Sequence, residues 1–287
     1  MKINNTPTHL NFKSIRYRYS HYEDCYGITR ETQNTTCVRE DLDCHELAKI
    51  IKKNFKNIDK LSLKPMNASD LTETYAVTSA LIDAFGFKTV QEKFSPILAT
   101  DVDSYIINKF GKKGVIGLTP KDETQIGKKN IKKFFEKISQ EPFKEKNDIL
   151  YFPDTNFYKT KPEFSSLFKT EQMDLQKRLH ELKDSGNSII LIRNCLAQSF
   201  GEFGTMFVLT QLEEKLKDGS LLVIGDYDRK NLRNLVSDLK EKGFYEIGIN
   251  IFRKGKPSTI SKINYFLTLF KSKFTNFMII NKKNIVK

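Results

Sequence analysis

The chain has 287 residues, of which 39% are hydrophobic and 29% charged, a composition typical of a folded globular protein. The first residues lack the apolar run of a secretory signal, and no run of about 18 apolar residues occurs, so we expect a cytoplasmic protein. The formal net charge is +13, but nine Lys or Arg residues and no acid lie between Asn250 and Lys287. Because the excess is mainly C-terminal, nucleic acid is not expected as a partner.

Residues 1–34 are polar and aperiodic, which predicts a poorly ordered N-terminal arm. The four cysteines are too few and too irregularly spaced for a disulfide framework. No C-x-x-C pair accompanies the histidines, so no metal is expected. Cys195 follows an apolar strand without a nearby histidine, which favours a buried small residue over a nucleophile.

From Asp41 onward, apolar residues at helical spacing predict a helix that Asp41 or Asp43 could cap. Strands are predicted at 60–65, 96–100, 148–152, 188–192 and 221–225, with two short ones within 244–254. Further helices are predicted at 73–85, 104–110, 123–138, 171–183, 202–216 and 230–242. This alternation predicts an α/β domain over residues 35–255, with a doubly wound, mostly parallel sheet and helices on both faces.

Polar residues stand where successive predicted strands end, which is where such sheets bind nucleoside-containing ligands. The first strand leads into the loop from Asn67 to Glu73, whose Ser69 and Asp70 precede a helix that could receive a carboxylate. Three further groups follow the later strands: Asp101, placed to accept ribose hydroxyls, Asp154, placed to hold an adenine amino group, and Arg193-Asn194, facing the reacting end.

Each of these residues also has a purely structural interpretation. The aspartates and Ser69 could be helix N-caps, a common role at strand-to-helix junctions. Arg193 could pair with a surface carboxylate. Their joint occurrence at successive strand ends is harder to explain by capping alone.

Five segments, in order, resemble motifs of the CheR-type methyltransferases, which methylate glutamates of bacterial chemotaxis receptors. They are Thr35–Glu40 (T-x-F-F-R-[DE]), Asn67–Tyr75 (A-C-S-[TD]-G-E-E-P-Y-S), Ala99–Asp103 (A-[ST]-D-I-D), Ser188–Phe200 (D-x-I-x-C-R-N-V-x-I-Y-F) and Lys217–Asp228 (L-x-P-G-G-x-L-x-x-G-x-S-E). The resemblance implies a class I methyltransferase fold, S-adenosylmethionine as cofactor, and transfer of a methyl group to an oxygen of a protein side-chain carboxylate.

Carried over by position, the resemblance implies a site at which Arg39, Arg193 and Asn194 are catalytic. Thr35 and Arg39 would contact the methionine end of the cofactor, and Ser69, Asp70 and Glu73 would belong to its first loop. Asp101 would bind ribose, Asp154 would lie near adenine, and Arg193 and Asn194 would line the floor of the site. The methyl acceptor, a protein or a small molecule, is not specified.

Two departures favour an alternative, a catalytically degenerate relative that acts as a binding or interaction module. Leu71 replaces the glycine of the first loop, where a left-handed backbone is expected to be unfavourable for leucine. Gln198 replaces the tyrosine of the fourth motif. The long N-terminal region and the β-insertion with which some chemotaxis enzymes dock on receptors are not evident, so chemotaxis receptors are not expected as substrates.

The C-terminal tail, residues 256–287, is basic and aromatic. Within it, residues 261–281 place apolar side chains at helical spacing, opposite a polar face. Such a helix could lie peripherally on an anionic membrane or pack on a protein surface.

Overall fold

The structure, a computed structural model, describes most of the chain between Tyr17 and Lys256. The described residues are 17–23, 29–35, 42–56, 59–68, 71–102, 111, 113–139, 149–150, 155–184 and 186–256. The predicted helix at 104–110 and the tail helix at 261–281 lie outside these ranges.

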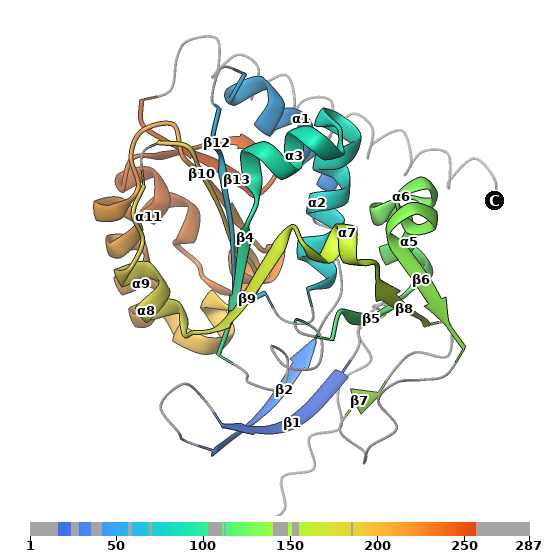
Figure 1. Cartoon of the computed structure of the whole chain (residues 1–287). Helices are drawn as coiled ribbons and strands as arrows, with labels where there is room; N and C mark the ends of the chain where they lie inside the picture. The colour runs from blue at the N-terminus through green and yellow to red at the C-terminus, as the bar shows by residue number, and fades with distance from the viewer. Residues whose placement is uncertain are drawn as a thin grey trace, which may run out of the picture.

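Seven of the described strands form one twisted sheet (Figure 1). Their order is β12 (Phe244–Gly248), β13 (Ile251–Lys254), β11 (Leu221–Ile224), β10 (Ser188–Ile192), β3 (Ser62–Met66), β4 (Ile97–Asp101) and β9 (Phe168–Gln172). Strands β9, β4, β3, β10 and β11 are parallel, whereas β13 runs antiparallel to both β11 and β12. This order, with one reversed strand, is that of the class I methyltransferase fold, and it confirms the predicted doubly wound sheet.

Helices cover both faces of the sheet because its central strands are apolar on both sides. Ile189 and Leu191 of β10 pack into one core, while Ile190 and Ile192 pack into the other. The first core is covered by α1 (Cys44–Asn54), α2 (Thr72–Phe85) and α3 (Phe87–Phe94). The second is covered by α8 (Leu175–His180), the π-helix η2 (Leu196–Phe200), α9 (Gly201–Lys215) and α11 (Leu235–Glu241).

Local signals explain where several elements begin and end. Asp43 caps α1, its side chain accepting hydrogen bonds from the N–H groups of His45 and Glu46 at 3.0 and 2.9 Å. Gly86 ends α2 with φ 86°, a conformation that favours glycine. The predicted cap and the predicted stop are both confirmed.

A second, antiparallel sheet lies in the chain between β4 and β9, and the sequence analysis did not predict it. Its strands are β5 (Val115–Leu118), β8 (Asn156–Thr160) and β6 (Phe135–Ile138), accompanied by α5 (Pro120–Ile126), α6 (Lys128–Phe134) and α7 (Pro162–Ser165). Tyr75 of α2 joins this unit to the main core, because its ring centroid lies 6.0, 5.4 and 5.0 Å from those of Phe135, Phe164 and Phe168.

Four predicted elements differ in the structure. The predicted helix at 230–242 is interrupted at residues 232–234, between α10 (Asp226–Asn231) and α11. The predicted helix at 123–138 is two short helices, α5 and α6, separated at Gly127 (φ 86°) and followed by β6. The predicted helix at 171–183 is shorter, because residues 168–172 form the edge strand β9. Of the predicted strand at 148–152 the structure describes residues 149–150, which form β7 (Ile149–Leu150) and pair with β1 (Tyr17–Glu23) in a sheet separate from the large one.

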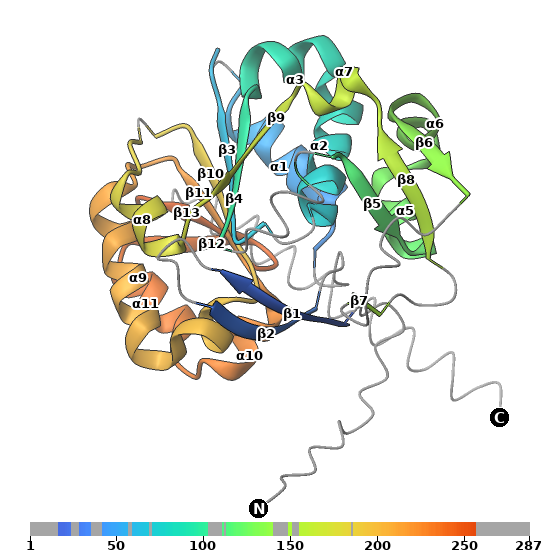
Figure 2. The same cartoon turned by 60° about the horizontal axis from the view of Figure 1, so that its bottom comes forward.

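The predicted N-terminal arm also contains regular structure. Strands β1 and β2 (Thr29–Thr35) pair in antiparallel register. In Figures 1 and 2 this hairpin lies on the side of the large sheet where the parallel strands end.

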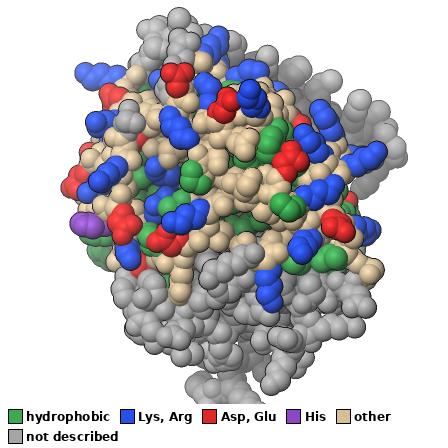
Figure 3. All heavy atoms as spheres, viewed as in Figure 1, with side chains coloured by type: hydrophobic (Ala, Val, Ile, Leu, Met, Phe, Trp, Pro, Cys, Tyr) green, Lys and Arg blue, Asp and Glu red, His purple; other side chains and the backbone are tan. Residues whose placement is uncertain are grey.

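The surface charges and the lengths of the helices are relevant to a nucleic-acid or membrane partner. On the face in Figure 3, Lys and Arg side chains are interspersed with carboxylates and do not form one continuous patch among the described residues. The longest helix in the described ranges, α9, has 15 residues, which is short of the about 20 that cross a bilayer. No described helix meets the length and hydropathy needed to span a membrane.

Candidate functional site

The loop after β3 has an unusual backbone. Asn67 has φ 54° and Leu71 has φ 65°, both in the left-handed region, and the N–H of Ala68 binds the carbonyl of Thr100 at 2.9 Å. Leu71 is the N-cap residue of α2, provides no side-chain cap, and is only 1% exposed. The sequence predicts that leucine is unfavourable at this position, where the backbone is left-handed. In the structure Leu71 nevertheless adopts the left-handed conformation, because its side chain is held in the core. Ser69 and Asp70 lie outside the described residues.

Glu73, in the first turn of α2, forms an ion pair with Arg193, which directly follows β10. The two residues are 120 positions apart in the sequence, and their side chains are 21% and 3% exposed respectively. The interpretation that Arg193 pairs with a carboxylate is therefore confirmed, and the acid in this pair, Glu73, is partly buried. Two charges withdrawn from water stay together only with good geometry, so each fixes the other's position.

Asp101 ends β4 and is 6% exposed. Its carbonyl accepts a hydrogen bond from the N–H of Met173 at 2.9 Å, and the side chain of Gln172 donates to the carbonyl of Val102 at 3.1 Å. The ends of β4 and β9 are therefore tied together beside this carboxylate. The helix that Asp101 might have capped lies outside the described residues.

The sequence predicts Asp154 as a site residue because it follows the strand predicted at 148–152, taken as the third strand of the sheet. That premise is wrong, because the neighbour of β4 is β9 and the residues that follow this neighbour are Met173 and Asp174. Asp154 itself lies outside the described residues. Polar β9 escaped detection because an edge strand needs few apolar side chains.

Asn194 follows Arg193 and has φ 58°. Its side-chain oxygen accepts a hydrogen bond from the N–H of Tyr227 at 3.0 Å, at the start of α10 (Asp226–Asn231). A Cβ atom on Gly225 would lie 2.1 Å from that oxygen. Asn194 therefore joins the end of β10 to the end of β11, and residue 225 must be glycine for the two to approach.

The pKa of the Cys195 thiol depends on groups from several strand ends. Burial, and after it the carboxylates of Asp228 and Asp101, raise the pKa of this thiol, while a hydrogen bond with Asn67 opposes the shift. Groups from the ends of β3, β4 and β11 therefore influence the pKa of a thiol that follows β10. A thiol with a raised pKa is protonated at neutral pH, which agrees with the predicted structural role of Cys195.

Asp228 of α10 is a site residue that the sequence analysis did not select. It is fully buried, and its side chain accepts a hydrogen bond from the N–H of Ala197 at 3.0 Å. The available signal was its place in the fifth resembling motif. Gln198 lies one residue beyond Ala197, on η2, and is exposed.

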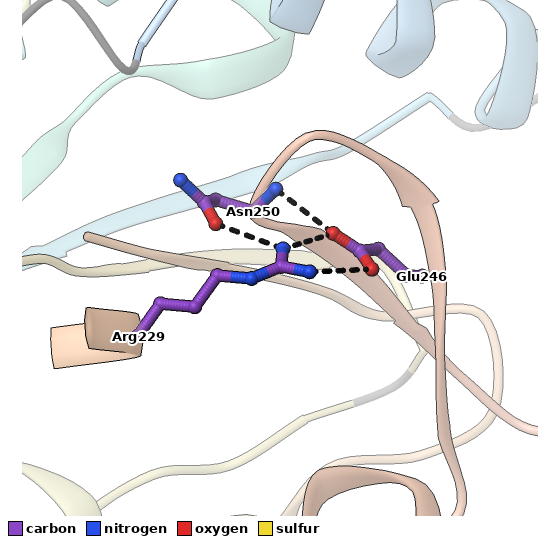
Figure 4. A network of polar contacts seen from close by, with 3 residues as sticks. All are labelled: Arg229, Glu246 and Asn250. Atoms are coloured by element: carbon purple, nitrogen blue, oxygen red, sulfur yellow. Dashed lines mark hydrogen bonds and ion pairs between the residues drawn. The ribbon is translucent and has the colours of Figure 1, made fainter. Parts of the chain in front are cut away.

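A polar network holds α10 to the β12–β13 hairpin (Figure 4). Arg229 pairs with Glu246 and also donates to the side-chain oxygen of Asn250 at 3.1 Å. The N–H of Asn250 in turn binds Glu246 at 3.2 Å, and its carbonyl accepts from the N–H of Ile224 at 3.0 Å. Because Ile224 ends β11, this network continues the carboxyl edge of the large sheet from β11 to the β12–β13 hairpin.

The two N-terminal site residues are only partly placed. Thr35 is the last residue of β2, opposite Tyr17 in register, and nothing is described of its side chain. Arg39 lies outside the described residues. The β1–β2 hairpin itself lies on the strand-end side, as Figure 2 shows.

The sequence matches no protein-family model and no curated protein. Among solved structures it is similar to a precorrin-6y C5,15-methyltransferase from Geobacter metallireducens GS-15, with 11% identity, a TM-score of 0.36, and coverage of 74% of this chain and 79% of that chain. It is also similar to WbdD, solved with the kinase inhibitor LY294002, with 8% identity, a TM-score of 0.38, and coverage of 74% and 40% respectively. At these TM-scores neither likeness bears on function, and the fold assignment depends on the strand order.

Proposed function

We propose that the chain is an S-adenosylmethionine-dependent methyltransferase of the CheR-like type, which methylates an oxygen of a protein side-chain carboxylate. The observation that carries the proposal is that hydrogen bonds and one ion pair join the carboxyl ends of β3, β4, β9, β10 and β11, at the edge of the sheet where the buried Asp101 lies. Ligands of doubly wound sheets sit at carboxyl ends where the strand order switches, here between β3 and β10.

Backbone strain supports a functional site at the same edge. All four non-glycine residues with positive φ in the described ranges lie there: Asn67, Leu71, Asn194 and Asn250. Such conformations cost roughly 1–3 kcal/mol each and cluster at ligand sites. Their concentration at one edge favours a site that binds a ligand.

The groups present fit S-adenosylmethionine. Asp101 would accept the ribose hydroxyls, and the first N–H groups of α2, which residue 71 does not cap, would receive the carboxylate. Glu73, Asp101 and Asp228 outnumber Arg193 and, by resemblance, Arg39, and this excess of carboxylates suits a sulfonium.

The bound cofactor would supply an electrophilic methyl group, so the task of the chain is alignment and exclusion of water. Arg193, held by Glu73, would form a fixed floor, and Asn194 would position α10 beside it. By resemblance, Thr35 and Arg39 would contact the methionine end. A carboxylate acceptor is already ionised at neutral pH, so no strong general base is needed.

The alternative, a degenerate interaction module, now depends mainly on Gln198. Leu71 no longer argues for it, because the loop keeps its left-handed turn with leucine. The exposed amide of Gln198 stands where the resembling motif has a tyrosine, and this one position favours loss of catalysis.

Isothermal titration with S-adenosylmethionine and S-adenosylhomocysteine tests the binding site. Wild-type protein should bind both, and Asp101→Ala should weaken binding by about 1–3 kcal/mol, roughly five- to 150-fold, because a charged hydrogen-bond acceptor is removed. Asp184→Asn, an acid at the opposite edge of the sheet, is the matched control and should bind normally. Equal affinity of folded Asp101→Ala and wild type would refute the assignment.

The acceptor is tested by transfer of a labelled methyl group to proteins of a cell extract. Carboxyl methyl esters hydrolyse in mild base, so the incorporated label should be released by base. Base-stable label would exclude a carboxylate acceptor, and no label with normal cofactor binding would favour the interaction module. Membranes that contain chemotaxis receptors should gain no label.

A further inference from the structure

Helix α9 is apolar on two faces. One face, with Val208, Leu209 and Leu212, is buried against the sheet. The other exposes Phe203 at 96%, Met206 at 40% and Phe207 at 51%, residues spaced three and four apart and therefore adjacent on the helix. Adjacent large apolar side chains exposed on one helix commonly mark a surface that another segment or partner covers, which indicates that something covers this outer stripe.

A groove of about 230 Å³ adjoins the stripe, between α9 and the segment that leads into α11. Its lining includes Phe203, Met206, Leu232 and Leu235, with the acids Glu202 and Asp238 at its sides. Glu214, also exposed, lies farther along α9. The lining of the groove therefore carries two acids against one cation, Arg233, and is acidic on balance.

The described chain ends close to this helix. The N–H of Gly219, four residues beyond the end of α9, binds the carbonyl of Lys254 at 3.0 Å. Lys256 is the last described residue, so residues 257–287 leave from beside the C-terminal end of α9. They contain six lysines and no acid, together with the phenylalanines at 266, 270, 274 and 277.

We propose that residues 261–281 form a helix that packs antiparallel along α9 and covers Phe203, Met206 and Phe207. A helix rises 1.5 Å per residue, so this segment would span roughly 30 Å and α9 spans roughly 22 Å. After a short connection, the tail reaches the exposed end of α9 with residues to spare. Its lysines meet the acids beside the stripe, and its phenylalanines fill the groove.

The chain contains no tryptophan, so Phe270→Trp introduces a single fluorescent reporter into the full-length protein. Its emission should be blue-shifted, and adding Phe203→Ser with Phe207→Ser should shift it to the red of free tryptophan. Ile249→Ser, which removes an exposed apolar side chain from the β12–β13 hairpin, is the matched control and should leave the emission unchanged. Equal emission with and without the two serines would overturn the proposal.

Limited trypsin digestion gives a second measurement without the reporter. Cleavage after Lys271 and Lys273 should be about tenfold faster or more in the double-serine variant, because proteolysis follows the population of the undocked tail. Equal cleavage rates would overturn the proposal. Protection that disappears on dilution would overturn it in favour of a second copy as the occupant.

Vesicles of phosphatidylcholine and phosphatidylserine at low salt separate docking on α9 from membrane attachment. The full-length protein should stay in the supernatant, because its phenylalanines are occupied. Sedimentation of wild type and double-serine variant alike would overturn the proposal and identify an anionic membrane as the surface that the tail binds. The proposal does not depend on methyl transfer, and these readouts need no cofactor.

Discussion

The two edges of the large sheet use left-handed backbone in opposite ways. At the amino edge, the left-handed positions flanking β10 and β11 are Gly186 and Gly219, and a Cβ on either would lie within 3.0 Å of a carbonyl oxygen across the turn. At the carboxyl edge, such positions are filled by Asn67, Leu71 and Asn194. Glycine adopts a left-handed backbone with little strain. Asn67, Leu71 and Asn194 keep that strain, and each adds a side chain at its position.

The acids at the two edges also differ in their surroundings. Asp184, at the amino edge, accepts hydrogen bonds from the N–H groups of Gly186 and Lys217, at 3.0 and 2.8 Å, and from the hydroxyl of Ser220. These partners lie in the two loops that lead into β10 and β11, so Asp184 ties the loops together and its role is structural. Asp101 and Asp228 instead lie at the carboxyl edge, which teaches that the acid at one edge holds the fold while those at the other stand where such sheets would bind a ligand.

Leu71 gives the largest expected effect in this comparison. Leu71→Ala should lower the free energy of unfolding by about 2–5 kcal/mol, because a side chain that is 1% exposed is lost. Leu71→Gly should be more stable than Leu71→Ala by about 1 kcal/mol, since glycine relieves the left-handed backbone. Urea unfolding measures both values.

Leu221 is the matched control, because it is fully buried in the regular strand β11. There the order should reverse, with the glycine variant less stable than the alanine variant. If alanine were also the better replacement at position 71, the loop would not be strained and the contrast between the edges would fail.

Gly225→Ala should cost about 1–3 kcal/mol of stability and weaken cofactor binding. The new Cβ would lie 2.1 Å from the side-chain oxygen of Asn194 and 2.5 Å from its backbone nitrogen, so the link between β10 and α10 must open. Gly248→Ala is the control, because its Cβ would first meet the flexible end of Ile50, at 2.8 Å. Similar losses at both glycines would contradict a specific role for Asn194.

Asp184→Asn should have the smallest effect, below about 1 kcal/mol, because the group is partly screened by solvent. Burial raises the pKa of this carboxyl, but hydrogen bonds from Ser220, Ser188, Lys217 and Gly186 outweigh it and hold the pKa below its ordinary value. A lowered pKa stabilises the fold above the unfolded-state value, and this contribution is lost as the pH falls through the folded-state pKa.

Urea midpoints of wild type and Asp184→Asn should therefore differ at neutral pH and converge in acid, near pH 4 or below by the ordinary value of about 3.9. A difference that grew towards acid pH would contradict the assignment. Weaker cofactor binding by this variant would erase the distinction between a structural edge and a ligand edge.

The large sheet was predictable where the signal is local. Ile189 to Ile192 form an unbroken apolar run, which is what a strand buried on both faces requires. The cap at Asp43 and the stop at Gly86 are likewise chosen by the nearest backbone groups. By contrast, β9 has a polar sequence and is a strand only because the edge of β4 is there to pair with it.

The candidate site divides in the same way. The sequence alone determined that Glu73, Asp101, Arg193 and Asn194 stand at strand ends or helix starts, because hydrophobic periodicity locates those boundaries. Only the tertiary structure paired Glu73 with Arg193 across 120 residues, brought the side chain of Asp228 to the N–H of Ala197, and made leucine acceptable at a left-handed position. The reason is physical: spacing along a chain sets local conformation, whereas burial and long-range charge exist only once distant strands are side by side.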